Sequence, residues 1–157
     1  AYYKPLLFES VILGVSGKLG YVTGLGDKVT QSQRFNLGGR NIRGFGSGGI
    51  GPRDTGSSDA VGGNKMYAGS FEVVSNLGLD KDTGVRWTVF TDFGSLWGTD
   101  YPSGVTKPNA SQMRVSAGVG IFWSTAIGPL SFSWAKPLSK MAHDTAKTFQ
   151  FNIGTRL

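Results

Sequence analysis

The sequence predicts an all-β protein: an antiparallel transmembrane β-barrel segment of about six strands plus a partial one, with a long loop that enters the lumen. Three observations support this class. Apolar and polar residues alternate with a period of two along several segments, as in strands with one apolar face. Short connections between these segments alternate with long ones. The polar face carries glycine, serine and asparagine with single charges, whereas the outside of a soluble sandwich carries many charges.

Composition narrows the class of protein further. The chain has 157 residues, 25 of them glycine and none cysteine, so it has neither a disulfide framework nor a thiolate metal site. Glycine inside strands marks bends and close approach of the backbone. The net charge is +6, but the basic residues are dispersed, which argues against a nucleic-acid face. Contact with anionic lipid headgroups and ordinary solubility both remain open. No stretch reaches the ~18 consecutive apolar residues of a membrane helix.

The first part of the chain predicts two strands and a long connection. Residues 2–7 are typical of a partial strand without a signal peptide before it, so we expect a fragment of a larger protein. A short connection at 8–10 leads to a strand at 11–22. The apolar face of that strand is formed by Val11, Leu13, Val15, Leu19 and Tyr21. Residues 24–64 then form a glycine-rich connection without apolar periodicity, and connections of this length are usually functional or disordered.

The rest of the chain predicts five strands, at 65–77, 85–97, 112–124, 130–137 and 147–157. The turns at 79–84 and 125–129 are short, whereas the connections at 98–111 and 138–146 are long. Short turns at one end and long loops at the other are typical of an outer-membrane barrel, with its apolar face toward lipid and its polar face toward the lumen. Interfacial aromatic residues are supplied by Trp87, Trp97, Tyr101, Trp123 and Trp134. On this pattern alone, a soluble antiparallel sandwich or barrel stays open.

The sequence offers little for catalysis, and we expect neither an enzyme nor a cofactor or metal site. Residues 44–49 match the spacing G-x-G-x-x-G, but no helical period follows them, as a dinucleotide site requires. His143 is the single histidine of a chain without cysteine, so a metal site lacks ligands. Serines and aspartates that could join His143 in a triad are present, but a G-x-S-x-G elbow is not.

The main candidate for a functional element is the loop 38–52. The centre of this loop is formed by Ile42, Arg43, Gly44 and Phe45. A guanidinium inside a barrel lumen needs a partner, and a carboxylate that accepts two hydrogen bonds is the best one. The alternation of the neighbouring strands turns Asp92, Glu72 and Phe90 inward, so two acids and one ring are available to the loop tip. A solvated loop arginine is the alternative interpretation.

These residues resemble a known family. Residues 41–45 resemble the V-R-G-F/Y loop motif of the BamA-type outer-membrane insertases. Three further segments match that family in the same order, at 50–53, 60–64 and 149–154. The resemblance covers essentially the whole chain. It implies that residues 1–157 are the C-terminal part of a sixteen-stranded outer-membrane barrel, with the soluble POTRA domains and the first barrel strands absent from this sequence.

The resemblance also implies a site and a mechanism. In the family the loop enters the lumen and its arginine pairs with an acid on the inner wall, so the matching positions are Arg43 and Asp92, with Glu72 and Phe90 nearby. The first and last barrel strands pair poorly there, the seam opens, and a client strand pairs with the exposed edge. The seam strand and C-terminal signal would include Phe149, Phe151, Ile153, Gly154 and Leu157. Family members usually end on an aromatic residue, whereas this chain ends on leucine.

The implied function is the folding and insertion of β-barrel proteins into the bacterial outer membrane through this lateral seam. The implied partners are outer-membrane lipid, unfolded outer-membrane protein clients, and assembly-complex lipoproteins bound through the missing POTRA domains, with no nucleic acid. The alternatives are a TamA-like relative, a two-partner secretion pore, or a passive porin-type barrel or barrel enzyme. The upstream sequence would separate them, since five POTRA repeats favour the insertase, three a TamA-like protein, two a secretion pore and none a porin.

Overall fold

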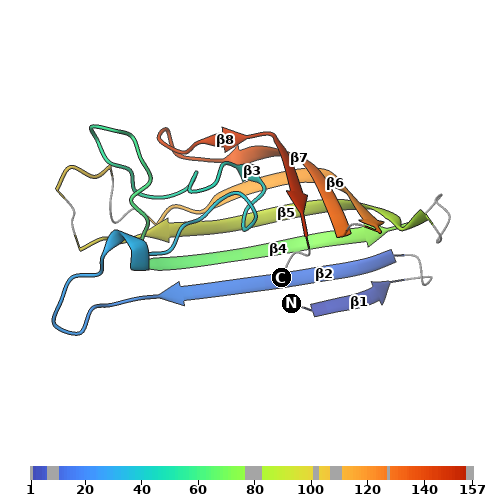
Figure 1. Ribbon diagram of the computed structural model, residues 1–157, viewed down its shortest axis with the longest axis horizontal. Coiled ribbons are helices and arrows are strands. Elements are labelled where there is room, and N and C mark those ends of the chain that lie inside the picture. Colours follow the sequence, from blue (N-terminus) through green and yellow to red (C-terminus); the bar gives the residue numbers. More distant parts are fainter. Residues whose placement is uncertain are drawn as a thin grey trace.

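The computed structural model describes residues 2–6, 11–76, 83–100, 103–106, 111–126 and 128–154. Within these residues, seven strands form one antiparallel sheet with the order β1-β2-β4-β5-β6-β7-β9 (Figure 1). The strands are β1 (Tyr2–Leu6), β2 (Val11–Tyr21), β4 (Lys65–Ser75), β5 (Val85–Trp97), β6 (Arg114–Thr125), β7 (Gly128–Ser139) and β9 (Phe149–Ile153). A second, two-stranded sheet pairs β3 (Gly44–Phe45) with β8 (Ala146–Lys147), and one 3-10 turn spans Gln31–Gln33. No helix among the described residues is long and apolar enough to cross a membrane.

The prediction of six strands and a partial one is confirmed, and β5 has the predicted bounds of 85–97. The end of the chain differs. The last strand, predicted at 147–157, is only five residues long, because the chain before it turns inward to pair β8 with β3. Gly154 follows β9 with a φ of 105°, a conformation that favours glycine. The predicted features that lie outside the described residues are Leu157, Tyr101, the connection at 8–10 and most of the turn at 79–84.

Strand β7 is longer than the predicted range of 130–137. It begins at Gly128, so Gly128 and Pro129, which were predicted in the turn, lie in the strand. Pro129 pairs with Ser124 of β6 at the start of the ladder, a position that tolerates proline because a strand end can spare a backbone donor.

The register of the sheet aligns polar residues across three neighbouring strands. Ser70 of β4 lies opposite Asp92 of β5, and Asp92 lies opposite Ser116 of β6. All three side chains are buried on the same face. Glu72 and Phe90 are also opposite each other, two residues along from this row and therefore on the same face. We call Ser70, Asp92 and Ser116 the polar row.

The opposite face of the sheet is apolar and exposed. Its exposed side chains include Leu19, Tyr21, Phe71, Val73, Val89, Val119, Ile121, Trp123, Trp134, Phe149, Phe151 and Ile153. A continuous apolar band of this kind on the outside of an antiparallel sheet is the surface that a barrel presents to lipid. The predicted division between an apolar outer face and a polar inner face is thereby confirmed.

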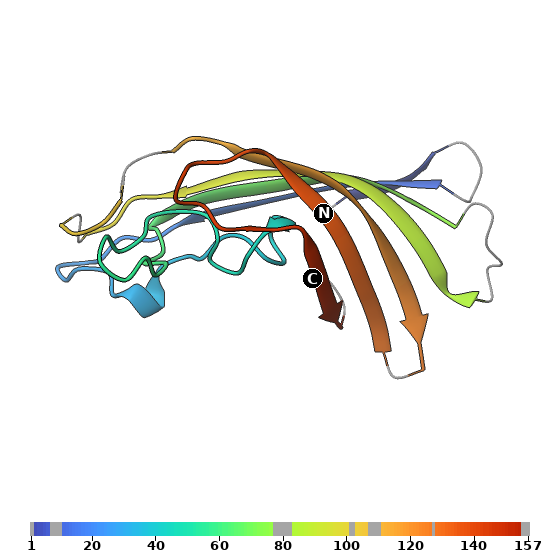
Figure 2. The ribbon, with the colours of Figure 1, turned by 90° about the horizontal axis from the view of Figure 1, so that it is seen from above.

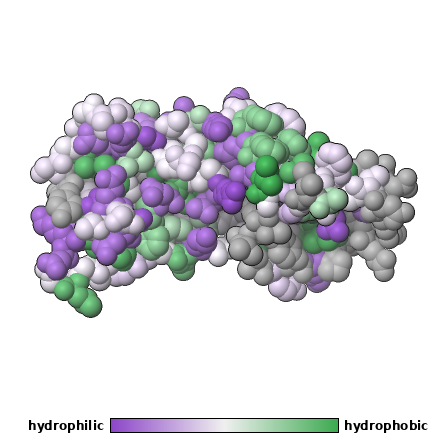
Figure 3. All heavy atoms as spheres, viewed as in Figure 1, coloured by the Kyte–Doolittle hydropathy of each residue, from purple (hydrophilic) through white to green (hydrophobic). Residues whose placement is uncertain are grey.

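The long connection between β2 and β4 lies on the concave side of this curved wall (Figure 2). A buried cluster joins the two, formed by Leu37, Ile42, Phe45 and Ile50 of the connection with Met66, Ala68 and Leu96 of the wall. The approach is close, since a Cβ at Gly94 of β5 would lie 2.7 Å from Cδ1 of Ile42. Hydrophilic residues gather over the end of the molecule that carries the long loops, on the left in Figure 3. The core of the described chain therefore lies between the loop and the inner wall.

The polar tip of this connection is closed by local hydrogen bonds. Asp54 Oδ1 accepts from the backbone N–H groups of Ser57 and Gly56, each at 2.8 Å. These two donors stabilise the charged carboxylate and lower the pKa of Asp54 below its ordinary value. The backbone N–H of Thr55 donates to the carbonyl of Gly104 at 2.8 Å, which ties the tip to the connection after β5.

Candidate functional site

The candidate site lies where the tip of loop 38–52 meets the polar row. The backbone N–H of Arg43 donates to Oδ2 of Asp92 at 2.9 Å. The Nε of Arg43 donates to the same oxygen at 2.8 Å, and Nη2 donates to Oδ1 at 2.7 Å. Asp92 has an exposed fraction of 0% and Arg43 one of 7%. A forked pair of this kind fixes the orientation of the arginine as well as its position.

Three other side chains complete the contacts of Arg43. Ser70 Oγ accepts from Nη2 at 3.0 Å and donates to Oδ1 of Asp92 at 2.6 Å. Glu72 Oε2 lies 3.4 Å from Nη1. The ring of Phe90 faces the guanidinium, with its centroid 3.3 Å from Cζ, in a cation–π arrangement. The structure thus brings Arg43 together with the three partners expected from the sequence, and it adds a contact with Ser70 that was not predicted.

The backbone beyond Arg43 runs directly against the wall. Gly44 has a φ of 89°, and a Cβ at this position would lie 3.2 Å from the Cβ atoms of Ser116 and Ala135. Ser116 Oγ donates a hydrogen bond to the carbonyl of Arg43. Phe45 follows and is fully buried in the cluster beneath the loop. Glycine is therefore required by both the backbone conformation and the space available.

A second buried ion pair lies at the end of the sheet that carries the long loops. Arg114, in the first position of β6, donates from Nε to Oδ2 of Asp144 at 2.9 Å and from Nη2 to Oδ1 at 3.2 Å. Its Nη1 donates to the carbonyl of Gln112 at 2.7 Å, and Oδ2 of Asp144 also accepts from the backbone N–H of Met141 at 2.6 Å. Asp144 lies in a loop without periodicity, so the sequence carried no signal that could have identified it as the partner of Arg114.

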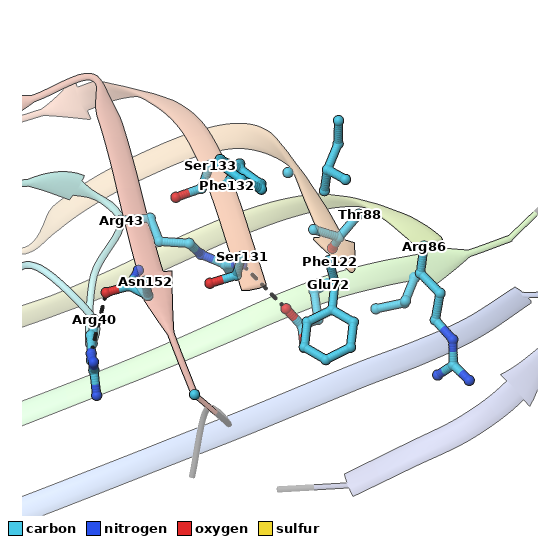
Figure 4. A pocket seen from close by; sticks show the side chains of 14 residues that line it. Arg40, Arg43, Glu72, Arg86, Thr88, Phe122, Ser131, Phe132, Ser133 and Asn152 are labelled. Carbon is cyan, nitrogen blue, oxygen red and sulfur yellow. Dashed lines mark hydrogen bonds and ion pairs between the residues drawn. The ribbon is translucent and has the colours of Figure 1, made fainter. Parts of the chain in front are cut away.

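A cavity of about 300 Å³ opens beside the docked loop, with Arg43, Glu72, Arg86 and Asn152 among the residues that line it (Figure 4). The residues that line the cavity include charges of both signs, hydroxyl groups and aromatic rings. The close-up also shows Arg40 of the loop, whose Nε donates to Oδ1 of Asn152 in the last strand at 3.2 Å. The loop therefore contacts both the middle of the wall and its last described strand.

Three of the residues predicted for the seam strand lie on the outer face of β9, whereas Gly154 follows the strand and Leu157 lies outside the described residues. Phe149, Phe151 and Ile153 are exposed, and the ring of Phe151 packs against that of Phe132 of β7 at an interplanar angle of 33°, with ring centroids 5.0 Å apart. Trp134 and Phe149 form a similar pair at 5.1 Å. These side chains belong to the apolar band, whereas the inward residues of the same strand meet the loop. The roles of β9 and of the Arg43 site in function stay predictions.

Comparison with known proteins identifies relatives over nearly the whole chain. The Omp85 superfamily domain matches residues 1–157. The outer membrane protein assembly factor BamA of Neorickettsia risticii is 32% identical over 92% of this chain, and BamA of Neisseria meningitidis is 30% identical over 95%. A SAM50-like protein of Schizosaccharomyces pombe is 30% identical over 93%. The chain spans about a fifth of the length of the two BamA relatives, 19% and 22%.

A solved structure has the same architecture. The crystal structure of BamA from Haemophilus ducreyi lacking POTRA domains 1–3 superposes with a TM-score of 0.82 and 35% sequence identity. The similarity covers 95% of this chain and 32% of that one.

The fold and the docked loop define a section of an integral outer-membrane β-barrel with a segment held inside its lumen. This class excludes the soluble sandwich that the strand pattern had left open. Because the family match extends over all 157 residues, the chain belongs to the Omp85 superfamily.

Proposed function

We propose that this chain is the C-terminal barrel segment of an outer-membrane protein assembly factor, which folds and inserts β-barrel proteins through a seam in its own wall. The observation that carries the proposal is the loop tip: Arg43 forms a buried forked pair with Asp92 in a chain whose bacterial relatives are named as assembly factors. The proposed activity is mechanical and involves no catalysed chemical step.

The two edges of the described sheet support a larger barrel. Among the described strands, β1 pairs only with β2, and β9 pairs only with β7. Unpaired backbone groups are not tolerated in lipid, so further strands would complete the wall in the whole protein. The share of the solved relative that the chain covers, 32%, agrees with such a segment. In this arrangement the unpaired edge of β9 would form one side of the seam.

The proposed clients are unfolded outer-membrane proteins, whose strands would add to the open edge of the seam through backbone hydrogen bonds. The apolar outer face would contact outer-membrane lipid. Assembly-complex lipoproteins are proposed to bind through POTRA domains upstream of this segment. Edge addition explains how one site could accept many clients, because the backbone pattern that it reads is shared by all strands.

The experiment is client assembly by the complete protein reconstituted in lipid vesicles. Arg43→Ala and Asp92→Ala should each reduce the yield of folded client, measured by its heat-modifiable gel mobility. Asp27→Ala, which removes a carboxylate from an exposed loop position, is the matched control and should assemble clients at the wild-type rate. Wild-type assembly by both site variants would contradict the proposed role of the loop.

A further inference from the structure

The last strand is held by the wall along only part of its neighbour. The ladder between β9 and β7 runs from the pair Leu130 and Ile153 to the pair Trp134 and Phe149, whereas β7 continues to Ser139. At that point the chain leaves the wall, and β8 pairs with β3 at the loop tip instead. In Figure 2 the red segment that precedes β9 lies beside the loop, and the dark red strand β9 follows it. This end of the chain is therefore held by the wall through β9 and by the lumenal loop through β8.

The segment before β9 is fastened to the loop by backbone hydrogen bonds. The N–H of Gly46 donates to the carbonyl of Thr145 at 2.9 Å, and the N–H of Thr145 donates to the carbonyl of Gly49 at 2.9 Å. The neighbouring residue, Asp144, is fixed from the other side by Arg114. The segment thus has one attachment to the wall and one to the loop, and the two attachments are adjacent in sequence.

Within β9 itself, two inward side chains continue this attachment. Gln150 Nε2 donates to the carbonyl of Phe45, and Asn152 Oδ1 accepts from Arg40. Gln150 has an exposed fraction of 6%, and its Oε1 is buried without a hydrogen-bond partner among the described residues. An aliphatic side chain of similar size would fill this space without an unsatisfied oxygen. The buried amide therefore contributes a hydrogen bond to the loop, and the cost is the unsatisfied oxygen Oε1.

We propose that Gln150 is a positioning residue that couples the last strand to the docked loop. While Arg43 is paired with Asp92, the Phe45 carbonyl is held at a fixed place on the wall, and Gln150 holds β9 to that point. A change in the position of β9 at its outer edge must then break this bond or displace the loop. The coupling itself does not depend on the proposed function. Its consequence, that loop docking controls the opening of the seam, rests on the proposed function.

The test is amide hydrogen exchange, read by mass spectrometry, on the complete protein in lipid nanodiscs. Gln150→Leu should exchange about threefold to tenfold faster at residues 149–153, the change in local opening expected from one lost hydrogen bond. Exchange in β4 and β5 should match the wild type. Gln31→Leu is the matched control, because Gln31 also donates from its side-chain amide to a backbone carbonyl, that of Ala60 at 3.1 Å, but within the loop. It should leave residues 149–153 unchanged.

Gln150→Glu separates a directed bond from simple packing. Its carboxylate cannot donate a hydrogen bond at neutral pH, so residues 149–153 should exchange faster than in the wild type at that pH. At acid pH, where the side chain is protonated, the ratio of the variant's exchange rate to that of the wild type should return toward one. Wild-type exchange at these residues in Gln150→Leu, or equal acceleration in β4 and β5, would overturn the coupling. Neither result depends on client assembly, so the inference can fail while the proposed function stands, and the converse also holds.

Discussion

Two arginines on the inner face of the wall, Arg43 and Arg114, are each held by an aspartate in a forked pair, and they differ in what else surrounds them. Arg43 approaches from the loop and meets Asp92, with Ser70, Glu72 and the ring of Phe90 in further contact. Arg114 belongs to the wall itself and reaches out to Asp144, the one acid that pairs with it in the described part of the chain.

The difference shows that two ion pairs of similar geometry can have different structural roles. Arg43 joins the loop to the centre of the sheet, and a second acid, Glu72, lies near its guanidinium. Arg114 orients the segment that leads into the last strand, and it has an exposed fraction of only 1%. We therefore expect the pair at Arg114 to be the more sensitive to loss of its acid, although the pair at Arg43 is the one expected to govern activity.

The largest effect is expected for Asp144→Ala. It leaves Arg114 buried without an acidic partner and removes the acceptor for the N–H of Met141. The loss in unfolding free energy should be roughly 3–5 kcal/mol, the range for breaking a buried ion pair. Urea unfolding of the complete barrel in lipid, followed by tryptophan fluorescence, measures it. Asp27→Ala at an exposed position should change the same quantity by less than about 0.5 kcal/mol.

A smaller loss is expected for Asp92→Ala. Arg43 would also lose its main partner, but Glu72 remains 3.4 Å from Nη1 and can move closer. The loss should therefore fall near the lower end of the same range of about 3–5 kcal/mol. The same unfolding measurement applies, and a loss larger than that of Asp144→Ala would reverse the ranking of the two pairs.

The smallest effect is expected for Glu72→Gln. Glu72 is partly exposed, its contact with Arg43 is long, and the amide oxygen of glutamine can still accept a hydrogen bond. The unfolding free energy should fall by about 1 kcal/mol or less, as for other solvent-accessible ion pairs. If Glu72→Gln proved as damaging as Asp92→Ala, the shared charge rather than the forked pair would be the main anchor of the loop.

The contacts of Arg43 could be predicted from the sequence because period-two alternation is a strong signal of which strand residues share a face. It turned Glu72, Phe90 and Asp92 to one face, and the glycine run around Arg43 marked a segment that had to lie close to something. The bounds of β5 followed from the same alternation. The site could therefore be predicted from local pattern together with the need of a buried guanidinium for a carboxylate.

The other end of the chain could not be predicted in this way. β8 is two residues long and exists because the loop offers β3 as a partner, so its strand character is tertiary in origin. Asp144 lies in a loop whose sequence has no period, so its pair with Arg114 could not be predicted from local pattern. The hydrogen bond from Gln150 to the carbonyl of Phe45 joins residues 105 positions apart, so it is visible only in three dimensions.

The pair between Arg43 and Asp92 anchors the lumenal loop to the wall. A double-mutant cycle on the unfolding free energy of the complete barrel measures this anchor, with Arg43→Ala, Asp92→Ala and the double variant compared under the same conditions. We expect a coupling free energy of about 2 kcal/mol or more between the two residues, since each single variant already removes the shared interaction. Losses that add to within about 0.5 kcal/mol would contradict it.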